Sequence, residues 1–297
     1  MNHPEPRPLV GVVIPVFNDW QRLQLCLQAL ARQSYPRERL LVRVVDNGST
    51  DWPAQPSFPL PLEVILHRHP GSYGARNQAA LGWAVDVLAF TDADCRPDPD
   101  WIAAGVSVLR VAESPARLVA GRILLEAQCP SHPTGGEQLD QILGFDQART
   151  VRRAGFGVTA NLFVAQAFFQ ELGGFQRRTH SGGDREFCYR AVATGATLLF
   201  EPDAVVRHPA RDWSELVHKQ RRIVGGRLSL AGHQPWARLR VLWLSMRPLI
   251  SESLRVGRFQ PLSVQRRLLL LSLVVRLRLA VFWEWLRLQR KGRDPLR

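Results

Sequence analysis

Short apolar runs alternate with amphipathic stretches over the first hundred residues. Residues 9–14 are continuously apolar up to Pro15, and similar runs follow at residues 40–45, 62–66 and 87–91. Runs of this length are typical of buried parallel strands. Residues 20–30 place apolar side chains at helical spacing behind Asp19, a candidate N-cap, and a second helix is expected at residues 74–85. This alternation predicts an α/β fold with a Rossmann-like, mainly parallel sheet flanked by helices.

The pattern changes after residue 100. Two more strands are expected, at residues 119–125 and in the Gly-rich segment 155–164, and a third is expected around residues 204–206. From Trp213 onward the spacing of apolar residues is helical. We therefore expect an α/β domain over residues 1–215 and a helical, basic C-terminal extension over residues 216–297.

Charge is distributed unevenly between these two parts. The 297-residue chain has a formal net charge of +13, but residues 1–215 carry −2 and residues 216–297 carry +15. A basic block of this kind attracts the phosphates of lipids, nucleic acids or pyrophosphate substrates. Genomic composition is a competing explanation for the arginine content, since Lys219 and Lys291 are the only lysines. It does not explain why the basic residues concentrate in the tail.

Cysteine spacing and the first residues bear on the cellular compartment. The four cysteines form no C-x-x-C pair and have no histidine at zinc-ligand spacing, so we expect reduced thiols. Residues 1–8 are polar and proline-rich, without the basic start and apolar run of a signal peptide. A cytoplasmic location is the expectation.

Candidate chemistry lies where the predicted strands end. Pro15, Asp46 and Asp92 fall at carboxyl ends of strands, which is where open α/β sheets bind ligands. Asp92 and Asp94 offer hard oxygen ligands that suit Mg²⁺ or Mn²⁺ bound together with substrate phosphates. Asp46 can accept hydrogen bonds from a base or ribose, although the turn-forming residues 47–51 have a purely structural explanation.

Two classes of nucleotide enzyme are disfavoured by the end of the first strand. That strand runs into Pro15-Val16-Phe17-Asn18-Asp19, which lacks the G-x-G-x-x-G fingerprint of dinucleotide sites. The same segment does not look like the Gly-rich phosphate loop of a nucleotidyltransferase. Asp98 and Asp100 are explained as caps of a helix that begins at Trp101.

Several motifs in a fixed order resemble the family 2 glycosyltransferases of GT-A fold. The first four are Val13-Ile14-Pro15-Val16-Phe17-Asn18, Val44-Val45-Asp46-Asn47-Gly48-Ser49-Thr50-Asp51, Gly74-Ala75-Arg76-Asn77 and Thr91-Asp92-Ala93-Asp94. The resemblance continues through Gly157-Val158-Thr159-Ala160-Asn161, Leu172-Gly173-Gly174-Phe175 and Gly182-Gly183-Asp184-Arg185-Glu186. It covers approximately residues 9–210.

The resemblance implies roles for particular residues. It places Asp46 at the base, Asp92 at the ribose, Asp94 at the metal and Asp184 as the general base that deprotonates an acceptor hydroxyl. The nucleotide-sugar pocket is completed by Pro15, Val16, Phe17 and Ala93. Members of the family commonly have Glu-Asp where this chain has Gly183-Asp184. The base is retained here without its usual acidic neighbour.

Further residues are candidates by position or by looser resemblance. His208 is expected to be a second metal ligand, a phosphate contact, or a solvent-exposed or capping histidine, and the guanidinium of Arg76 suits a phosphate. The diphosphate contacts predicted in the tail are Gln220 and Arg222, and those predicted on the acceptor side are Thr159 and Asn161.

The implied reaction is an in-line, inverting transfer from a nucleotide-diphosphate sugar to an acceptor hydroxyl, assisted by Mg²⁺ or Mn²⁺. The acceptor can be a glycan, a lipid or a small alcohol, and lipid-linked glycan or polysaccharide synthesis is one hypothesis. A competing role for Asp184 is capping of the helix at residues 186–193. The alternatives for the whole chain are a non-catalytic nucleotide-binding or regulatory member of the fold, and a nucleotidyltransferase.

The tail has features of a surface that contacts a membrane. Residues 268–275 are all apolar, but this run is far shorter than the roughly 20 residues of a membrane span. Arg276 and Arg278 point about 200° apart on a helix, so no single apolar face exists if both stay in water. Aromatic residues such as Trp243 and Trp283 lie among many arginines. We expect peripheral binding to an anionic membrane, with packing on protein or an oligomer contact as the alternative, and no nucleic-acid partner.

Overall fold

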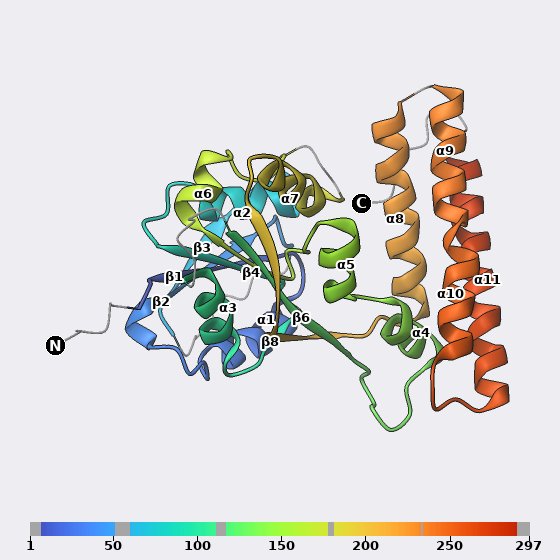
Figure 1. Cartoon of the computed structure of the whole chain (residues 1–297), viewed down its shortest axis with the longest axis horizontal. Coiled ribbons are helices and arrows are strands. Elements are labelled where there is room, and N and C mark those ends of the chain that lie inside the picture. Colours follow the sequence, from blue (N-terminus) through green and yellow to red (C-terminus); the bar gives the residue numbers. More distant parts are fainter. Residues whose placement is uncertain (1–6, 51–59, 111–116, 178–180, 233, 290–297) are drawn as a thin grey trace. The chain divides into compact units, whose positions relative to one another are not determined.

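The computed structural model describes residues 7–50, 60–110, 117–177, 181–232 and 234–289 (Figure 1). Asp51, which ends the second motif, lies outside the described residues. The chain forms two compact units, each built from two segments. The first unit contains Met1–Leu124 and Asp146–His208, and the second contains Leu125–Phe145 and Pro209–Arg297.

An eight-stranded sheet forms the first unit and runs in the order β3-β2-β1-β4-β7-β6-β8-β5. Its strands are β1 (Val10–Val16), β2 (Leu40–Asp46), β3 (Leu62–Leu66), β4 (Val87–Thr91), β5 (Arg96–Pro97), β6 (Arg117–Glu126), β7 (Asn161–Ala165) and β8 (Thr197–Pro209). The four apolar runs of the sequence are β1 to β4, which pair in parallel. The next strand, β7, pairs antiparallel with both β4 and β6. The predicted α/β class is confirmed, and half of the sheet is parallel.

Helices border the strands of this unit. They are α1 (Trp20–Leu30), α2 (Ser72–Ala80), α3 (Trp101–Arg110), α5 (Gln147–Ala154), α6 (Gln166–Glu171) and α7 (Gly183–Ala193), with a short 3-10 helix η1 (Arg37–Arg39). Asp19 occupies the N-cap of α1, but its side chain makes no capping hydrogen bond and lies 3.5 Å from Arg22. The Gly-rich segment predicted as a strand is mostly irregular, because Gly155 ends α5 in the left-handed region and regular pairing begins at Asn161.

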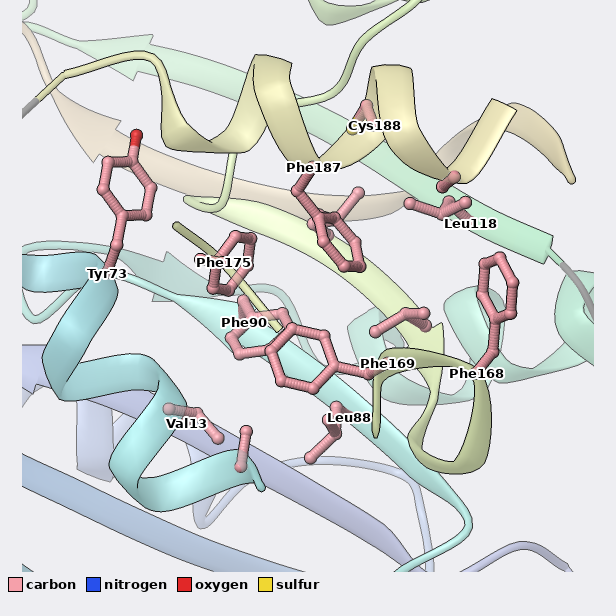
Figure 2. Close-up of a cluster of buried hydrophobic side chains, with 14 of the residues drawn as sticks. Val13, Tyr73, Leu88, Phe90, Leu118, Phe168, Phe169, Phe175, Phe187 and Cys188 are labelled. Atoms are coloured by element: carbon pink, nitrogen blue, oxygen red, sulfur yellow. The ribbon is translucent and has the colours of Figure 1, made fainter. Parts of the chain in front are cut away.

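An aromatic cluster holds several of these elements together (Figure 2). The ring of Phe175 lies 4.9 to 5.5 Å from the rings of Tyr73, Phe90, Phe169 and Phe187. These rings come from α2, β4, α6 and α7. Aromatic pairs at such distances add to the stabilisation from area burial. The cluster therefore fixes the first turn of α2 relative to the start of α7.

The second unit is helical. It contains α4 (Gly135–Leu143), α8 (Trp213–Ala231), α9 (Pro235–Met246), α10 (Pro248–Arg258) and α11 (Val264–Arg287). Buried ion pairs join these helices. Arg278 of α11 is 3% exposed, donates to Glu252 of α10 and donates a 3.0 Å hydrogen bond to the Ser245 carbonyl. Glu284 accepts hydrogen bonds from Arg221 and Arg287.

The burial of Arg278 changes the expected surface of α11. The condition that would interrupt this face, exposure of both Arg276 and Arg278, is not met, because only Arg276 is exposed. The α11 face opposite the bundle interior is therefore less interrupted by charge than the sequence indicates. Across the described segments, no helix combines the length and apolarity that crossing a membrane requires.

Candidate functional site

The ends of β1 and β2 lie side by side in the first unit. Their register pairs Val16 with Asp46, and the Asn47 amide donates a 2.8 Å hydrogen bond to the Val16 carbonyl. The buried Asp46 carboxylate accepts a 2.9 Å hydrogen bond from the Ser49 amide, so its observed partner is the turn that follows β2. Asn18 adopts a left-handed φ of 50° and accepts from the Thr50 amide at 2.9 Å, which ties the two loops together.

The predicted nucleotide-pocket residues of β1 differ in exposure. Pro15 is half-buried and Val16 is buried, whereas the Phe17 side chain is 58% exposed at the end of the strand. Ala93, which follows β4, is buried. Of these four residues, Phe17 offers the largest apolar surface on which a planar base can stack.

Arg76 and Asp92 form an ion pair beside the end of β4. The Arg76 guanidinium is 3% exposed and donates to the Asp92 carboxylate, whose side chain is partly exposed. The Arg76 Nε is buried without a hydrogen-bond partner, which is costly for a cation unless a ligand completes the site. Arg76 therefore has its observed charge partner in Asp92, and its phosphate contact stays a prediction.

Asp94 and His208 supply the donor atoms of a candidate metal centre. The His208 Nε2 lies 3.3 Å from Asp94 Oδ2, and the Cys95 thiol belongs to the same group of atoms, all within 4.8 Å of one another. Burial raises the pKa of Cys95 well above its usual value, and the charges of Asp94 and Asp92 raise it further. A carboxylate oxygen and an imidazole nitrogen suit Mn²⁺ well, so these residues fit the predicted ion.

The other two acids of this region have structural partners. Asp98 accepts from Arg207 Nε at 2.6 Å and from a terminal guanidinium nitrogen of the same arginine at 3.0 Å. Asp100 accepts a 2.6 Å hydrogen bond from the Ser34 hydroxyl. Both acids contact side chains of other elements outside the metal centre, and their capping of α3 stays a prediction.

Asp184 lies in the first turn of α7, where the helix dipole favours a negative charge. Its Oδ1 accepts a 2.9 Å hydrogen bond from the Arg185 amide. Burial raises the pKa of the Asp184 carboxyl, while hydrogen bonds from the Arg185 and Thr159 amides and the Tyr73 hydroxyl, together with the charge of Arg76, oppose the shift. A base with a raised pKa loses activity as the pH falls through that pKa, at a higher pH than for an ordinary aspartate.

The two residues predicted on the acceptor side lie in different environments. Thr159 is buried, and its backbone amide contacts Asp184. The Asn161 amide is fully buried and saturated: it donates to the carbonyls of Arg122 and Ala204 at 2.9 and 2.8 Å and accepts from Trp101 at 2.8 Å. Asn161 thus ties strands of the sheet together, and we propose a positioning role for it in place of a direct acceptor contact.

The predicted diphosphate residues lie on α8 in the second unit. Gln220 is half-buried and Arg222 is exposed. Beside them, burial and the charges of Arg211 and Arg222 lower the pKa of Lys219 to about 8 despite the opposing charge of Asp140. The Lys219 ammonium lies 4.7 Å from the centre of the Phe145 ring, and the diphosphate contacts of Gln220 and Arg222 stay predictions.

A family model described as glycosyl transferase family 2 matches residues 11–163, just over half of the chain. The chain belongs to glycosyltransferase family 2. Glycosyltransferase AglE of Haloferax volcanii is 34% identical over 229 residues, which cover 75% of this chain and 74% of that protein. A pre-mycofactocin glycosyltransferase of Mycobacterium tuberculosis is 30% identical over 227 residues, covering 70% of this chain but only 46% of that protein. These relatives make the chain an enzyme of the glycosyltransferase class.

Solved structures of similar shape confirm the GT-A fold of this family 2 member. The mannosyltransferase PcManGT from Pyrobaculum calidifontis, in complex with GDP-Man and Mn²⁺, has a TM-score of 0.62 at 18% identity, covering 96% of this chain and 89% of that one. TarS of S. aureus in complex with UDP has a TM-score of 0.51 at 15% identity, with coverages of 96% and 93%. At such identities the likeness establishes the fold alone.

One residue at the family 2 site was not singled out from the sequence. Tyr73, in the first turn of α2, packs its ring at Gly183, and its hydroxyl opposes the rise in the pKa of Asp184. The signal was present in the departure at Gly183, since a glycine beside the predicted base indicates that another group occupies the space. Only the packing of α2 against α7 identifies that group as Tyr73.

Proposed function

We propose that this chain is a metal-dependent, inverting glycosyltransferase that moves a sugar from a nucleotide-diphosphate donor to an acceptor hydroxyl. The observation that carries the proposal is the environment of Asp184. Its half-buried carboxylate is held at the start of α7 within the field of Arg76, which is itself paired with Asp92. A carboxylate in that position is fixed, retains hydrogen-bonding capacity and has a raised pKa, which are the properties of a general base.

In the proposed reaction Asp184 accepts the proton of the acceptor hydroxyl as its oxygen attacks the anomeric carbon. The bond from that carbon to the diphosphate oxygen breaks on the opposite side, so the anomeric configuration inverts. Asp46 and Phe17 are the proposed contacts of the nucleoside. Asp94 and His208 would hold Mg²⁺ or Mn²⁺, whose positive charge would offset that of the departing diphosphate.

The donor class is inferred from relatives and the acceptor class remains broad. Complexes with GDP-Man and with UDP are described for structural neighbours, so both guanosine and uridine diphosphate sugars are candidate donors. Proposed acceptors are a glycan, a lipid or a small alcohol. We keep residues 1–215 as the proposed catalytic domain and residues 216–297 as its helical extension.

Product stereochemistry tests this proposal. Purified protein with Mn²⁺ is incubated with α-linked GDP- and UDP-hexoses and simple alcohol or glycan acceptors, and nucleotide release is measured by chromatography. The product anomer is then assigned from its proton coupling constant. We expect a β-linked product. An α-linked product would contradict direct displacement, and the absence of nucleotide release from every donor would contradict the transferase proposal.

We further propose that the helical extension binds an anionic membrane surface. On α11 the exposed residues Val264, Leu268, Val275, Leu279 and Trp283 fall within about 100° of the helix circumference. Helix α9 exposes Trp236, Leu239 and Trp243, and α10 exposes Ile250 and Leu254. Exposed arginines, including Arg240, Arg247 and Arg276, accompany these stripes. Aromatic and aliphatic surface interleaved with arginine suits a lipid interface with anionic headgroups.

Vesicle sedimentation tests the membrane proposal. We expect the full-length protein to bind vesicles that contain phosphatidylglycerol and to bind pure phosphatidylcholine vesicles much more weakly. The triple variant Trp236→Ala/Trp243→Ala/Trp283→Ala should lower binding by about tenfold or more. The control Leu25→Ala/Leu66→Ala removes exposed apolar residues of the first unit and should change nothing. A protein without affinity for either vesicle, or one that buries these stripes in a stable oligomer, would contradict the proposal.

A further inference from the structure

Gly183 has no backbone reason to be glycine. Gly182 before it adopts a left-handed φ of 83° at the N-cap of α7, but Gly183 is the first residue of the helix and is not in that region. A Cβ atom added to Gly183 would lie 2.8 Å from two carbons of the Tyr73 ring. Contacts below 3.0 Å essentially never occur for real Cβ atoms. Position 183 is therefore restricted to glycine by the ring of Tyr73.

The Tyr73 ring cannot easily move aside. It is 7% exposed and packs against Phe175, with 5.5 Å between the ring centres. Asn77, one turn further along α2, clamps the backbone of Phe175: its side chain donates to the Phe175 carbonyl at 2.7 Å and accepts from the Phe175 amide at 2.8 Å. Figure 2 shows the Tyr73 hydroxyl projecting from the aromatic cluster toward the start of the helix that carries Phe187 and Cys188.

The hydroxyl at the end of this fixed ring contacts the candidate base. The Tyr73 ring packs at position 183, and its hydroxyl is close enough to the adjacent Asp184 carboxylate that each group shifts the pKa of the other. Burial raises the pKa of Tyr73 well above its usual value, and the charge of Asp184 raises it further. The phenol is therefore protonated at any working pH and acts as the donor to the carboxylate.

We propose that Tyr73 is the positioning residue of the catalytic base, taking the place beside Asp184 that an acidic residue commonly takes in this family. This inference rests on the proposed role of Asp184 as the base. The presence of tyrosine at position 73 and of glycine at position 183 are coupled, because the ring that brings the hydroxyl to Asp184 also excludes any side chain from position 183. A neutral donor stabilises the charged form of Asp184, whereas an acidic neighbour would repel it.

The other groups that face Asp184 cannot substitute for this hydroxyl. On α7 they are the Arg185 amide, which holds Oδ1 at 2.9 Å, and the Cys188 thiol, whose pKa burial raises to about 12. The Thr159 amide also contacts the carboxylate, and Arg76 acts on it through its charge while paired with Asp92. Among these groups, Tyr73 offers a donor that a single substitution removes without changing the net charge.

The test is Tyr73→Phe, which keeps the ring against Gly183 and removes only the hydroxyl. We expect kcat to fall by about tenfold with the donor KM unchanged, because one hydrogen bond to a charged group is lost. The acidic limb of the kcat/KM profile should move to higher pH by about one unit. The matched control is Tyr189→Phe, which removes another hydroxyl, one that α7 carries and that donates at 3.0 Å to the Ala154 carbonyl of α5; this variant should behave as wild type.

A double-variant cycle tests the steric half of the inference. Gly183→Ala alone should lower kcat strongly, since the added methyl group collides with the Tyr73 ring. In a Tyr73→Ala background the same change should cost less than about twofold, because the colliding ring is gone. Equal effects of Gly183→Ala in both backgrounds would overturn the coupling.

The outcomes separate this inference from the proposed function. If Asp184→Asn abolishes transfer while Tyr73→Phe keeps the wild-type kcat and pH profile, the positioning role of Tyr73 is wrong. The role of Asp184 as the general base is then still supported. A fall in kcat with an equal rise in donor KM and no pH shift would also overturn it, as that pattern indicates a general structural role. A ¹³C NMR titration of the Asp184 carboxyl makes the comparison without turnover, and an unchanged pKa in Tyr73→Phe contradicts the inference.

Discussion

Replacing Asp184 by asparagine is expected to lower the rate of sugar transfer by about 10²- to 10⁴-fold and to leave donor binding unchanged. The amide can still accept a hydrogen bond from the Arg185 amide, so the start of α7 keeps its structure. It cannot take a proton from the acceptor hydroxyl. Initial rates of nucleotide release with acceptor present, compared with donor affinity from calorimetry, separate the two effects.

The control for this substitution is Asp203→Asn, which neutralises an exposed acid of β8 in the same unit and should not change the rate. A purely capping Asp184 predicts a different result. In that case Asp184→Asn would lose at most about 1 to 2 kcal/mol of stability and retain its turnover. Retained turnover in Asp184→Asn would therefore remove Asp184 from the mechanism.

The second large effect is expected for Asp94→Ala. Removing this carboxylate leaves His208 as the remaining predicted ligand and should lower turnover by at least about 100-fold at ordinary metal concentration. Titration of Mn²⁺ into the assay measures the effect, and excess Mn²⁺ should restore little of the rate. Asp100→Ala is the control, because Asp100 contacts Ser34 outside the metal centre and its loss should leave the metal dependence unchanged. Equal metal activation of Asp94→Ala and the wild type would exclude Asp94 as a ligand.

The parallel half of the sheet could be predicted because its information is local. Strands β1, β2 and β4 are short, mostly buried apolar runs, and β3, at the sheet edge, is a shorter and more exposed run of the same kind, so each can be read from its own residues. The antiparallel half of the sheet was less predictable from the sequence. Strand β7 begins only at Asn161, and its start depends on pairing with Thr91 of β4, a contact between segments 70 residues apart in the chain.

At the candidate site, too, the positions of the residues are more predictable than their contacts. Asp46, Asp92 and Asp94 follow strand ends, so their neighbourhood is predictable from the order of the strands. The side chains that contact these acids are not predictable from the order of the strands. Arg76 pairs with Asp92 and Tyr73 contacts Asp184 only because α2 packs close to both β4 and α7. A sequence motif indicates that a residue is at the site without indicating what it contacts there.

Burial of polar residues was the least predictable property. Asn161 matches a family motif and is a saturated amide inside the sheet, while Arg278 follows an apolar run and is buried against Glu252. A buried arginine is costly unless a carboxylate pairs with it. That partner lies 26 residues away on α10, and its position is set by the fold of the second unit.

Calorimetric titration with GDP and UDP, each with and without Mn²⁺, tests the central claim most directly. We predict that one of the two nucleotides binds the wild-type protein, that Mn²⁺ strengthens its binding, and that Asp94→Ala loses the metal-dependent part. This result would support a nucleotide-diphosphate site organised by a metal and identify which donors to screen. Binding of neither nucleotide in any condition, or binding that Mn²⁺ and Asp94→Ala leave unchanged, would contradict a metal-dependent nucleotide-sugar transferase.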